Sequence, residues 1–534
     1  MEGSTGRNRP TLVATVAAAG IVQLPTAAIV VALPTIHAQF DTSIAELQWT
    51  VTAFYIPFAA FLIASGRLAD VFGRRRLLIA GSLIFSLGSG LAMVAPGAPL
   101  LIAGIALAGI GGSMLIPSSM SLVTNVFSGE RRALAIGMWG AATELVSGIG
   151  VLVGGVLTGE LSWRWIFGVD VAVALSIAVV ALLWVPESRD PKAERRVDLR
   201  GAALSASALT ALTLALIQGA SWGWGSVATI SLVAVSLLLF AAFFVTEARS
   251  RQPLIELEFF KRRNFTGATT TVFVIDFSFG ALLFFLPLYF QEILAYSATE
   301  TGLILLPLTG LMVIASPLGG KVAARVGPRP PIVAGLLMMA GAVLWISTLD
   351  LGTTYADLWL PTAIMGFGIG FALTPMNLAA MNAVPQEHTG AAAGLLVTLS
   401  GLGSTLGVAV TGAVFQELQT DRTISLVDDT GVEVSRETAQ QLTGVLAGSP
   451  GGEKTLEQVA GGSEVGAVET AVREAFVSAL GTSLKLSAAL ILLGALVAAA
   501  LMRRSSPGDA AASAQPVGSA SPRPAPLGAG AASV

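Results

Sequence analysis

The stretch GRLADVFGRRR, residues 66–76, decides the fold, and long apolar runs flank it on both sides. Its basic side chains therefore lie in a very short loop between two predicted membrane helices. A positive loop this tight is typical of the cytoplasmic side of a membrane. Gly66 and Gly73 permit a sharp turn with close helix approach, while Asp70 can cap a helix or pair with Arg74. A plain cytoplasmic hairpin is the simplest interpretation of such a loop.

The whole chain has the composition that this hairpin requires. Of its 534 residues, 54% are hydrophobic and only 12% are charged, and the mean hydropathy is +0.77. Soluble domains carry about twice that share of charged residues, so the composition predicts a protein that crosses the membrane many times. The chain has no cysteine and two histidines, which excludes disulfides and a histidine or cysteine metal site. His37 and His388 fall in predicted loops, and we assign them no role.

Apolar runs of about 18 residues are long enough to span a bilayer as helices, and the chain contains fourteen of them. The predicted spans are residues 11–34, 48–66, 77–95, 99–123, 134–157, 164–185, 201–219, 226–247, 265–291, 300–318, 329–347, 358–381, 389–415 and 477–502. The first is interpreted as an uncleaved helix rather than a signal peptide, because many spans follow it. The sequence therefore predicts an all-α membrane protein with 14 transmembrane helices.

The distribution of basic residues predicts the orientation of the chain. If the N-terminus is cytoplasmic, 24 of the 30 arginines and lysines fall in cytoplasmic segments. Cytoplasmic loops are enriched in these residues, and an even number of spans puts both termini on one side. We therefore predict that both termini are cytoplasmic.

A weak internal repeat divides the chain into halves. GGKVAARVGPRPP, residues 319–331, resembles the opening stretch at an offset of 254 residues. Likewise, VALP ending at Pro34 corresponds to FFLP ending at Pro287. The repeat predicts two pseudo-symmetric six-helix bundles with two helices inserted between them. Asp70 corresponds to Ala324, so only the first copy keeps the acidic residue.

These signals together define the expected organisation of the chain. It comprises a cytoplasmic arm (1–10), an N-terminal six-helix bundle (11–185), a linker with two extra helices (186–264, helices near 201–219 and 226–247), a C-terminal bundle (265–502) and a disordered cytoplasmic tail (503–534). An acidic loop, residues 416–476, is expected outside the membrane, with a short helix at 437–446. The tail is rich in Ala, Ser, Pro and Gly, a composition that does not support a packed core.

Two carboxylates are expected inside the membrane. Glu144 and Asp276 lie 10 and 11 residues from the cytoplasmic ends of their spans, which places both about 15 Å deep at a rise of about 1.5 Å per residue. Small and polar residues share their helical faces, so both side chains are expected to point inward. An ionised carboxylate at mid-membrane costs about 2.5–3.5 kcal/mol and often marks a proton or ion pathway. We favour such a role for Asp276, whereas for Glu144 a role in packing is an equal alternative.

Glycines cluster in the fifth predicted span, at Gly150, Gly154 and Gly155. Small residues four apart let helix backbones approach closely in lipid. Their spacing predicts either plain bundle packing or a hinge.

The loop at residues 66–76 resembles the signature between the second and third helices of the major facilitator superfamily. Gly66, Asp70, Gly73, Arg74 and Arg75 match this signature. Further matches to the fourteen-helix drug:proton antiporter branch are Leu47-Gln48-Trp49, Gly109-Ile110-Gly111 with Pro117, Gly150 with Gly154-Gly155, Trp163-Arg164-Trp165-Ile166-Phe167, Pro253-Leu254, and Pro287-Leu288-Tyr289-Phe290-Gln291. The resemblance implies that the loop is a gate, in which the aspartate holds the cytoplasmic side shut.

The chain departs from that branch where the family carries charge inside the membrane. Pro25 stands where the first helix usually has an aspartate, and Ile105 stands where the fourth span usually has an arginine. Ser400 and the following glycine replace an arginine-glutamine pair in the thirteenth span. The family's coupling residues therefore do not carry over, and Asp276, helped by Glu144, is the candidate proton-coupling residue.

The residues and the resemblance together predict a secondary transporter rather than an enzyme. It is expected to export an apolar or weakly cationic small molecule, such as an antibiotic, across the bacterial cytoplasmic membrane by alternating access driven by protons. Candidate cavity residues are Gln23, Trp49, Tyr55, Phe277 and Asn377. We expect a monomer in the lipid bilayer that uses no cofactor, no metal and no nucleic acid.

Two alternatives stay open from the sequence. A lipid exporter or an uptake facilitator would keep the fold and change the task. A membrane-embedded enzyme or sensor is more remote, because the sequence has no paired nucleophile and base, no metal-ligand set and no phosphate-binding loop.

Overall fold

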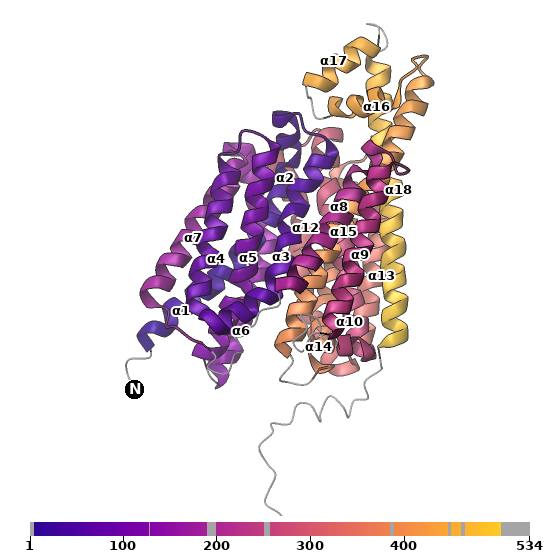
Figure 1. Ribbon diagram of the computed structural model, residues 1–534. Coiled ribbons are helices and arrows are strands. Elements are labelled where there is room, and N and C mark those ends of the chain that lie inside the picture. The colour runs from indigo at the N-terminus through magenta and orange to yellow at the C-terminus, as the bar shows by residue number, and fades with distance from the viewer. Residues whose placement is uncertain are drawn as a thin grey trace, which may run out of the picture.

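The structure is a computed structural model that describes residues 5–127, 129–189, 199–249, 257–384, 389–446, 450–460 and 465–502. The elements in these ranges are helices, and no strand occurs among them. The all-α fold class is therefore as predicted (Figure 1).

The helices follow one another in the order expected for two bundles. The first half contains α1 (Thr5–Ile21), α2 (Gln23–Phe40), α3 (Ile44–Phe72), α4 (Arg74–Met93), α5 (Ala98–Val126), α6 (Gly129–Val156), the π-helical turn η1 (Leu157–Leu161) and α7 (Arg164–Trp184). The inserted pair is α8 (Leu199–Trp222) and α9 (Val227–Arg249), followed by the short 3-10 helix η2 (Leu257–Lys261). The second half contains α10 (Arg263–Leu288), the π-helical turn η3 (Tyr289–Ile293), α11 (Ala298–Ile304), α12 (Leu306–Val326), α13 (Arg329–Ile346), α14 (Tyr355–Asn382), α15 (Thr389–Asp428) and α18 (Val465–Leu501).

Many of these helices are long and apolar enough to cross a membrane. In the described ranges, 11 helical stretches meet this criterion. Two shorter apolar stretches, Leu145–Leu161 and Ala203–Gly219, belong to α6 with η1 and to α8, and α3 is 29 residues long. With these three included, the helix order is consistent with the fourteen predicted spans.

The first predicted span lies within one apolar stretch, Asn8–Phe40, in which only Val22 separates α1 from α2. α1 ends at Ile21 and α2 begins at Gln23, and α2 continues past Pro34 to Phe40. It ends where Asp41 adopts a left-handed conformation with φ of 50°, which aspartate tolerates better than most residues. The prediction that His37 lies in a loop is therefore wrong, because His37 is part of the last turns of α2. His388 lies outside the described residues.

The predicted loop 416–476 contains more helix than expected. α15 extends to Asp428 and α18 begins at Val465, and between them lie α16 (Arg436–Leu442), η5 (Thr443–Val445) and α17 (Pro450–Val459). The predicted helix at 437–446 corresponds to α16 with η5, whereas α17 was not predicted. A search for apolar runs does not detect such polar helices. We call the end of the bundles that carries α16 and α17 the cap end, and the opposite end, near the N-terminus, the terminal end (Figure 1).

The two halves meet along two interfaces: α3 packs against α15, and α2 and α6 pack against α10, α11 and α12. The inserted helix α8 packs against both α3 and α15. Ala45 on α3, Ile217 on α8 and Ala409 on α15 form one small buried cluster at this seam. On the outer face of the inserted pair, Leu237 and Leu238 of α9 are 63% and 70% exposed. Such exposed apolar side chains suit contact with lipid. The inserted helix α8 therefore bridges the two bundles, while α9 faces away from them.

Candidate functional site

The predicted gating loop lies at the terminal end, between α3 and α4. Gly73 has a φ of 112°, a conformation that residues with a side chain rarely adopt. A Cβ at this position would also lie 2.5 Å from Oε1 of Glu187. Both backbone geometry and space therefore require glycine here.

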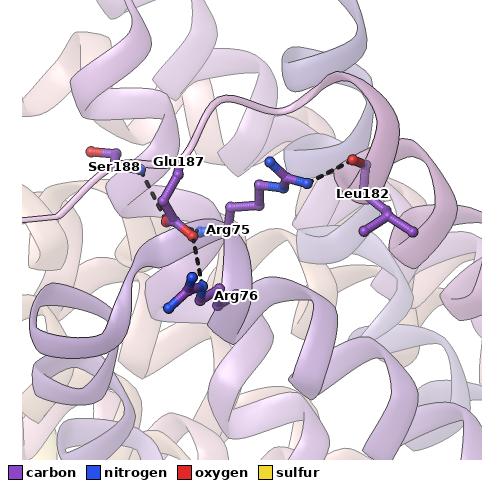
Figure 2. Close-up of polar contacts among 5 residues, drawn as sticks. All are labelled: Arg75, Arg76, Leu182, Glu187 and Ser188. Atoms are coloured by element: carbon purple, nitrogen blue, oxygen red, sulfur yellow. Dashed lines mark hydrogen bonds and ion pairs between the residues drawn. The ribbon is translucent and has the colours of Figure 1, made fainter.

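Glu187, which follows α7, caps the start of α4 (Figure 2). Its Oε1 accepts hydrogen bonds from the backbone N–H groups of Arg75 at 3.2 Å and of Ser188 at 3.0 Å. The Arg75 side chain donates from Nη2 to the carbonyl of Leu182 at 2.7 Å. A carboxylate at a helix N-terminus interacts favourably with the helix dipole. The loop is thus tied to the end of α7 in its own bundle.

Arg74 strengthens the same connection from inside the bundle. Its backbone N–H donates to the carbonyl of Ser188 at 2.9 Å, and its Nη1 donates to the Ser188 hydroxyl at 3.0 Å. Gly66, which lies in α3 before the loop, is close to Pro117 of α5. The side chain of Asp70 is outside the described part of the structure. The gate contact of Asp70 with the other half therefore stays a prediction.

Asp276 lies on α10 where this helix packs against α15. The hydroxyl of Ser400 hydrogen-bonds to the Asp276 carboxylate, and Ser404 Oγ donates to the Asp276 carbonyl at 3.5 Å. A Cβ on Gly403 would lie 3.3 Å from Cβ of Asp276, so glycine at that position allows α15 to approach closely. The Asp276 side chain therefore faces a neighbouring helix rather than lipid.

Tyr55 brings the first half of the chain to the same place. Hydrogen bonds connect its hydroxyl to Thr26 of α2 and to Ser404 of α15, and it interacts electrostatically with Asp276. Its ring lies 3.7 Å from the Cβ position of Gly401. We call Asp276, Ser400, Ser404, Tyr55 and Thr26 the Asp276 cluster. It joins α2 and α3 of one bundle to α10 and α15 of the other.

The other predicted cavity residues lie in different surroundings. Gln23 begins α2, and its carbonyl accepts a hydrogen bond from Thr26 Oγ1 at 2.9 Å. Trp49 packs on the cluster between α3, α8 and α15. Phe277 is buried, whereas Asn377 is exposed and donates to a carbonyl of its own helix, α14. The structure thus brings Tyr55 to Asp276 and places Trp49 and Asn377 elsewhere.

The predicted glycines of α6 lie at two interfaces. A Cβ on Gly150 would lie 2.9 Å from Cβ of Ala27, and Gly154 contacts the backbone of Ala28, so both allow α6 to approach α2. Gly155 instead lies against the carbonyl of Ala298 on α11, in the other half, where a Cβ would lie 2.6 Å from that oxygen. Close approach of this kind is how small residues pack membrane helices. The side chain of Glu144, on the same helix, is outside the described part of the structure.

Sequence reasoning missed a third carboxylate, Asp170 on α7. It is fully buried, and Ser89 of α4 is its hydroxyl neighbour. The expectation of only two acids inside the membrane is therefore wrong. The signal was available, because Asp170 falls within the predicted span 164–185. Asp170 packs within the first bundle and is not part of the Asp276 cluster.

Two of the positions where the chain lacks the family's charges meet in space. Pro25 of α2 and Ile105 of α5 line one small apolar cavity of about 10 Å³, which is no larger than one water molecule requires. Its other lining residues are Thr26, Ile29, Thr50, Val51, Phe54 and Phe167. At these positions the chain lacks both the aspartate and the arginine of the family. No single charge is therefore left unpaired beside the cavity, which would be costly.

Two bundles of apolar helices that meet along a seam, with a polar cluster between them, define a multi-pass membrane protein of the transporter type. Residues 15–408 match the model of the Major Facilitator Superfamily, and the chain belongs to this family of transporters.

Relatives of the chain share most of its length. It is 30% identical to the tetracenomycin C resistance and export protein of Streptomyces glaucescens, covering 96% of this chain and 95% of that protein. It is 31% identical to the multidrug efflux pump LfrA of Mycolicibacterium smegmatis, covering 89% of this chain and 92% of that protein. It is 33% identical to the multidrug resistance protein Stp of Mycobacterium tuberculosis, covering 76% of this chain and 75% of that protein. Among solved structures, an inward-facing bacterial homologue of the human lysosomal transporter Spinster has a TM-score of 0.61 at 18% identity, covering 95% of this chain and 100% of that one. This likeness supports the fold.

Proposed function

We propose that the chain is a secondary transporter that exports an apolar or weakly cationic drug or antibiotic across the bacterial cytoplasmic membrane. Membership of the Major Facilitator Superfamily supports this proposal, as do relatives whose names describe resistance and export. The observation that carries it is the Asp276 cluster, a carboxylate held at the seam between two bundles. Alternating access requires the bundles to move relative to each other at such a seam.

Asp276 is the proposed proton-coupling residue. A charged carboxylate at this depth is costly, whereas a hydrogen bond from Ser400 stabilises the charged form. Tyr55 comes from the other bundle, so separation of the bundles changes the surroundings of the carboxylate. Proton occupancy and bundle position are then linked, which is the requirement for coupling.

The gating loop and the orientation belong to the same proposal. The terminal end carries Arg74, Arg75 and Arg76 at the start of α4, which favours a cytoplasmic location. Asp70, with Arg74, is proposed to hold the terminal end shut while the cap end is open. The protein would act as a monomer.

The test is efflux of a fluorescent lipophilic cation from an efflux-deficient bacterium that expresses the chain. Asp276→Asn is expected to lower pH-driven efflux at least about tenfold, because the amide keeps the hydrogen-bonding shape but carries no proton to exchange. Glu433→Gln is the control, since Glu433 is an exposed acid in the segment at the cap end. Full pH-driven efflux by Asp276→Asn would show that coupling does not use this residue.

A further inference from the structure

A buried hydrogen bond joins the two bundles at the cap end. His37 at the end of α2 and Glu292 in η3 face each other, with Nδ1 and Oε1 3.0 Å apart. Their side chains are 4% and 3% exposed. The residues are 255 positions apart in the chain and belong to different halves. The pair therefore persists only while the two halves touch at this end.

Other contacts at the cap end also cross between the halves. Gln291, the residue before Glu292, donates from Nε2 to the carbonyl of Val31 at 2.8 Å. Thr299 Oγ1 donates to the carbonyl of Gly155 at 3.3 Å. His37 and Glu292 thus lie among several contacts that hold the two halves together at the cap end.

The α2 side of the His37–Glu292 contact is anchored within its own bundle. Gln39 Oε1 accepts hydrogen bonds from Trp163 Nε1 at 2.8 Å and from Arg164 Nη1 at 3.2 Å. Arg164 also donates from Nη2 to the carbonyl of Ala95 at 2.9 Å. These contacts fix the end of α2 to the start of α7.

The η3 side is anchored in the second bundle. Tyr289 donates its hydroxyl proton to the carbonyl of Asp350 at 2.7 Å, and Arg473 Nη1 reaches the carbonyl of Ile293 at 3.5 Å. Because both partners are held by their own bundle, the His37–Glu292 contact cannot adapt by local bending. It breaks when the bundles part.

The internal repeat explains why these two positions meet. His37 follows Pro34 by three residues, and Glu292 follows the corresponding Pro287 by five. Parallel repeats in this fold are related by an axis along the membrane normal, so corresponding helix ends lie opposite each other across that axis. The two side chains are therefore placed where the bundles close on each other.

We propose that His37 and Glu292 form a latch that holds the cap end closed and must break whenever the transporter opens there. A hydrogen bond to a charged group stabilises more than a neutral one, and removing one partner leaves the other buried without compensation. The latch sets the fraction of time that the cap end is open. This inference rests on the proposed alternating-access function for its role in transport.

The absence of cysteine from the chain permits a direct test of opening. Val31→Cys places a single thiol at a residue that is 0% exposed, beneath the latch on α2. A membrane-impermeant maleimide is added from the side that carries the cap, and the labelling rate is measured in intact membranes. The latch is then altered in this background by His37→Gln, by Glu292→Gln, and by the swapped pair His37→Glu with Glu292→His.

Each single variant is expected to label at least about tenfold faster. This corresponds to a loss of about 1.4 kcal/mol in the free energy that favours the closed cap end. The swapped pair is expected to restore slow labelling. Arg436→Gln is the matched control, because it breaks the ion pair of Arg436 with Glu417, which lies within one half at the same end. Its labelling is expected to stay within about twofold of the parent, as for an exposed pair.

Equal labelling of the single variants and the control would overturn the latch. Faster labelling that the swapped pair does not reverse would overturn it too, because general loosening rather than this contact would then have exposed the thiol. The assay does not read efflux. If the protein exports none of the tested drugs, the labelling assay still tests the latch. If the protein exports a drug but the variants label at the parent rate, the latch is wrong and the proposed function stands.

Discussion

The carboxylate of Glu187 occupies the space that a side chain on Gly73 would need. A Cβ on Gly73 would lie 2.5 Å from Oε1 and 2.9 Å from Oε2 of Glu187. The same carboxylate caps α4 through the N–H of Arg75. The glycine of the loop signature and the acid after α7 therefore form one structural unit at the terminal end, although 112 residues separate Arg75 from Glu187.

Gly73→Ala should destabilise the protein by about 1–3 kcal/mol, because alanine pays for the left-handed backbone and displaces Glu187. The measurement is the thermal unfolding of the purified protein. Gly431→Ala, at a residue with φ of 90° and open space around it, isolates the backbone contribution. An equal loss in both variants would show that the contact with Glu187 adds nothing.

Glu187→Gln should cost about 0.5–2 kcal/mol, the usual range for loss of a helix cap. It should also increase amide hydrogen exchange at the start of α4. Glu258→Gln is the control, because Glu258 and Lys261 form a pair whose side chains are 86% and 80% exposed. Such pairs contribute little. Unchanged exchange at Arg74–Arg76 in Glu187→Gln would contradict the capping role.

Tyr55→Phe should reduce efflux while keeping the fold. The ring stays in place beside Phe54, with centroids 5.7 Å apart, but the hydroxyl no longer connects Thr26 to Ser404. Loss of such hydrogen bonds is worth about 0.5–1.5 kcal/mol each, so efflux should fall about threefold to tenfold. Initial efflux rates at matched expression provide the measurement. Parent-like rates would remove Tyr55 from the proposed coupling site.

Gly155→Ala should impair closure of the cap end and lower stability by about 1–3 kcal/mol, the usual cost of overpacking. The added methyl group would lie 2.6 Å from the carbonyl oxygen of Ala298 in the other half. Gly341→Ala on α13 is the matched control, because nothing lies within 4 Å of its Cβ position, and it should be neutral or stabilising. Thermal unfolding of both variants decides the matter. Equal behaviour would mean that α6 and α11 do not need this close contact.

Ile105→Arg alone should be strongly destabilising, because it places an unpaired charge beside an apolar cavity of about 10 Å³. An uncompensated buried charge costs about 3–5 kcal/mol. Adding Pro25→Asp should recover part of that loss, since both positions line the same cavity. A double-mutant cycle on unfolding temperatures measures the recovery, and strictly additive effects would argue against direct contact between the two side chains.

Several features of this protein follow from its sequence alone. Apolar runs of sufficient length must be membrane helices, because an unpaired backbone is too costly in lipid. The basic hairpin at residues 66–76 and the repeat at an offset of 254 residues therefore determined the helical architecture and its division into halves. The position of Asp276 along its predicted span also follows from the sequence, because residues can be counted along a helix of known rise.

The tertiary structure decided which side chains meet. Helices that are apolar on all sides carry little information about their rotation, because both lipid and protein neighbours accept apolar side chains. Only the packed bundles show that Tyr55 reaches the Asp276 cluster and that Pro25 and Ile105 share a cavity. The structure also shows that His37, which was predicted to lie in a loop, belongs to α2 and is buried against Glu292. Its partner lies in the other half, and no local pattern encodes a contact across two separately folded bundles.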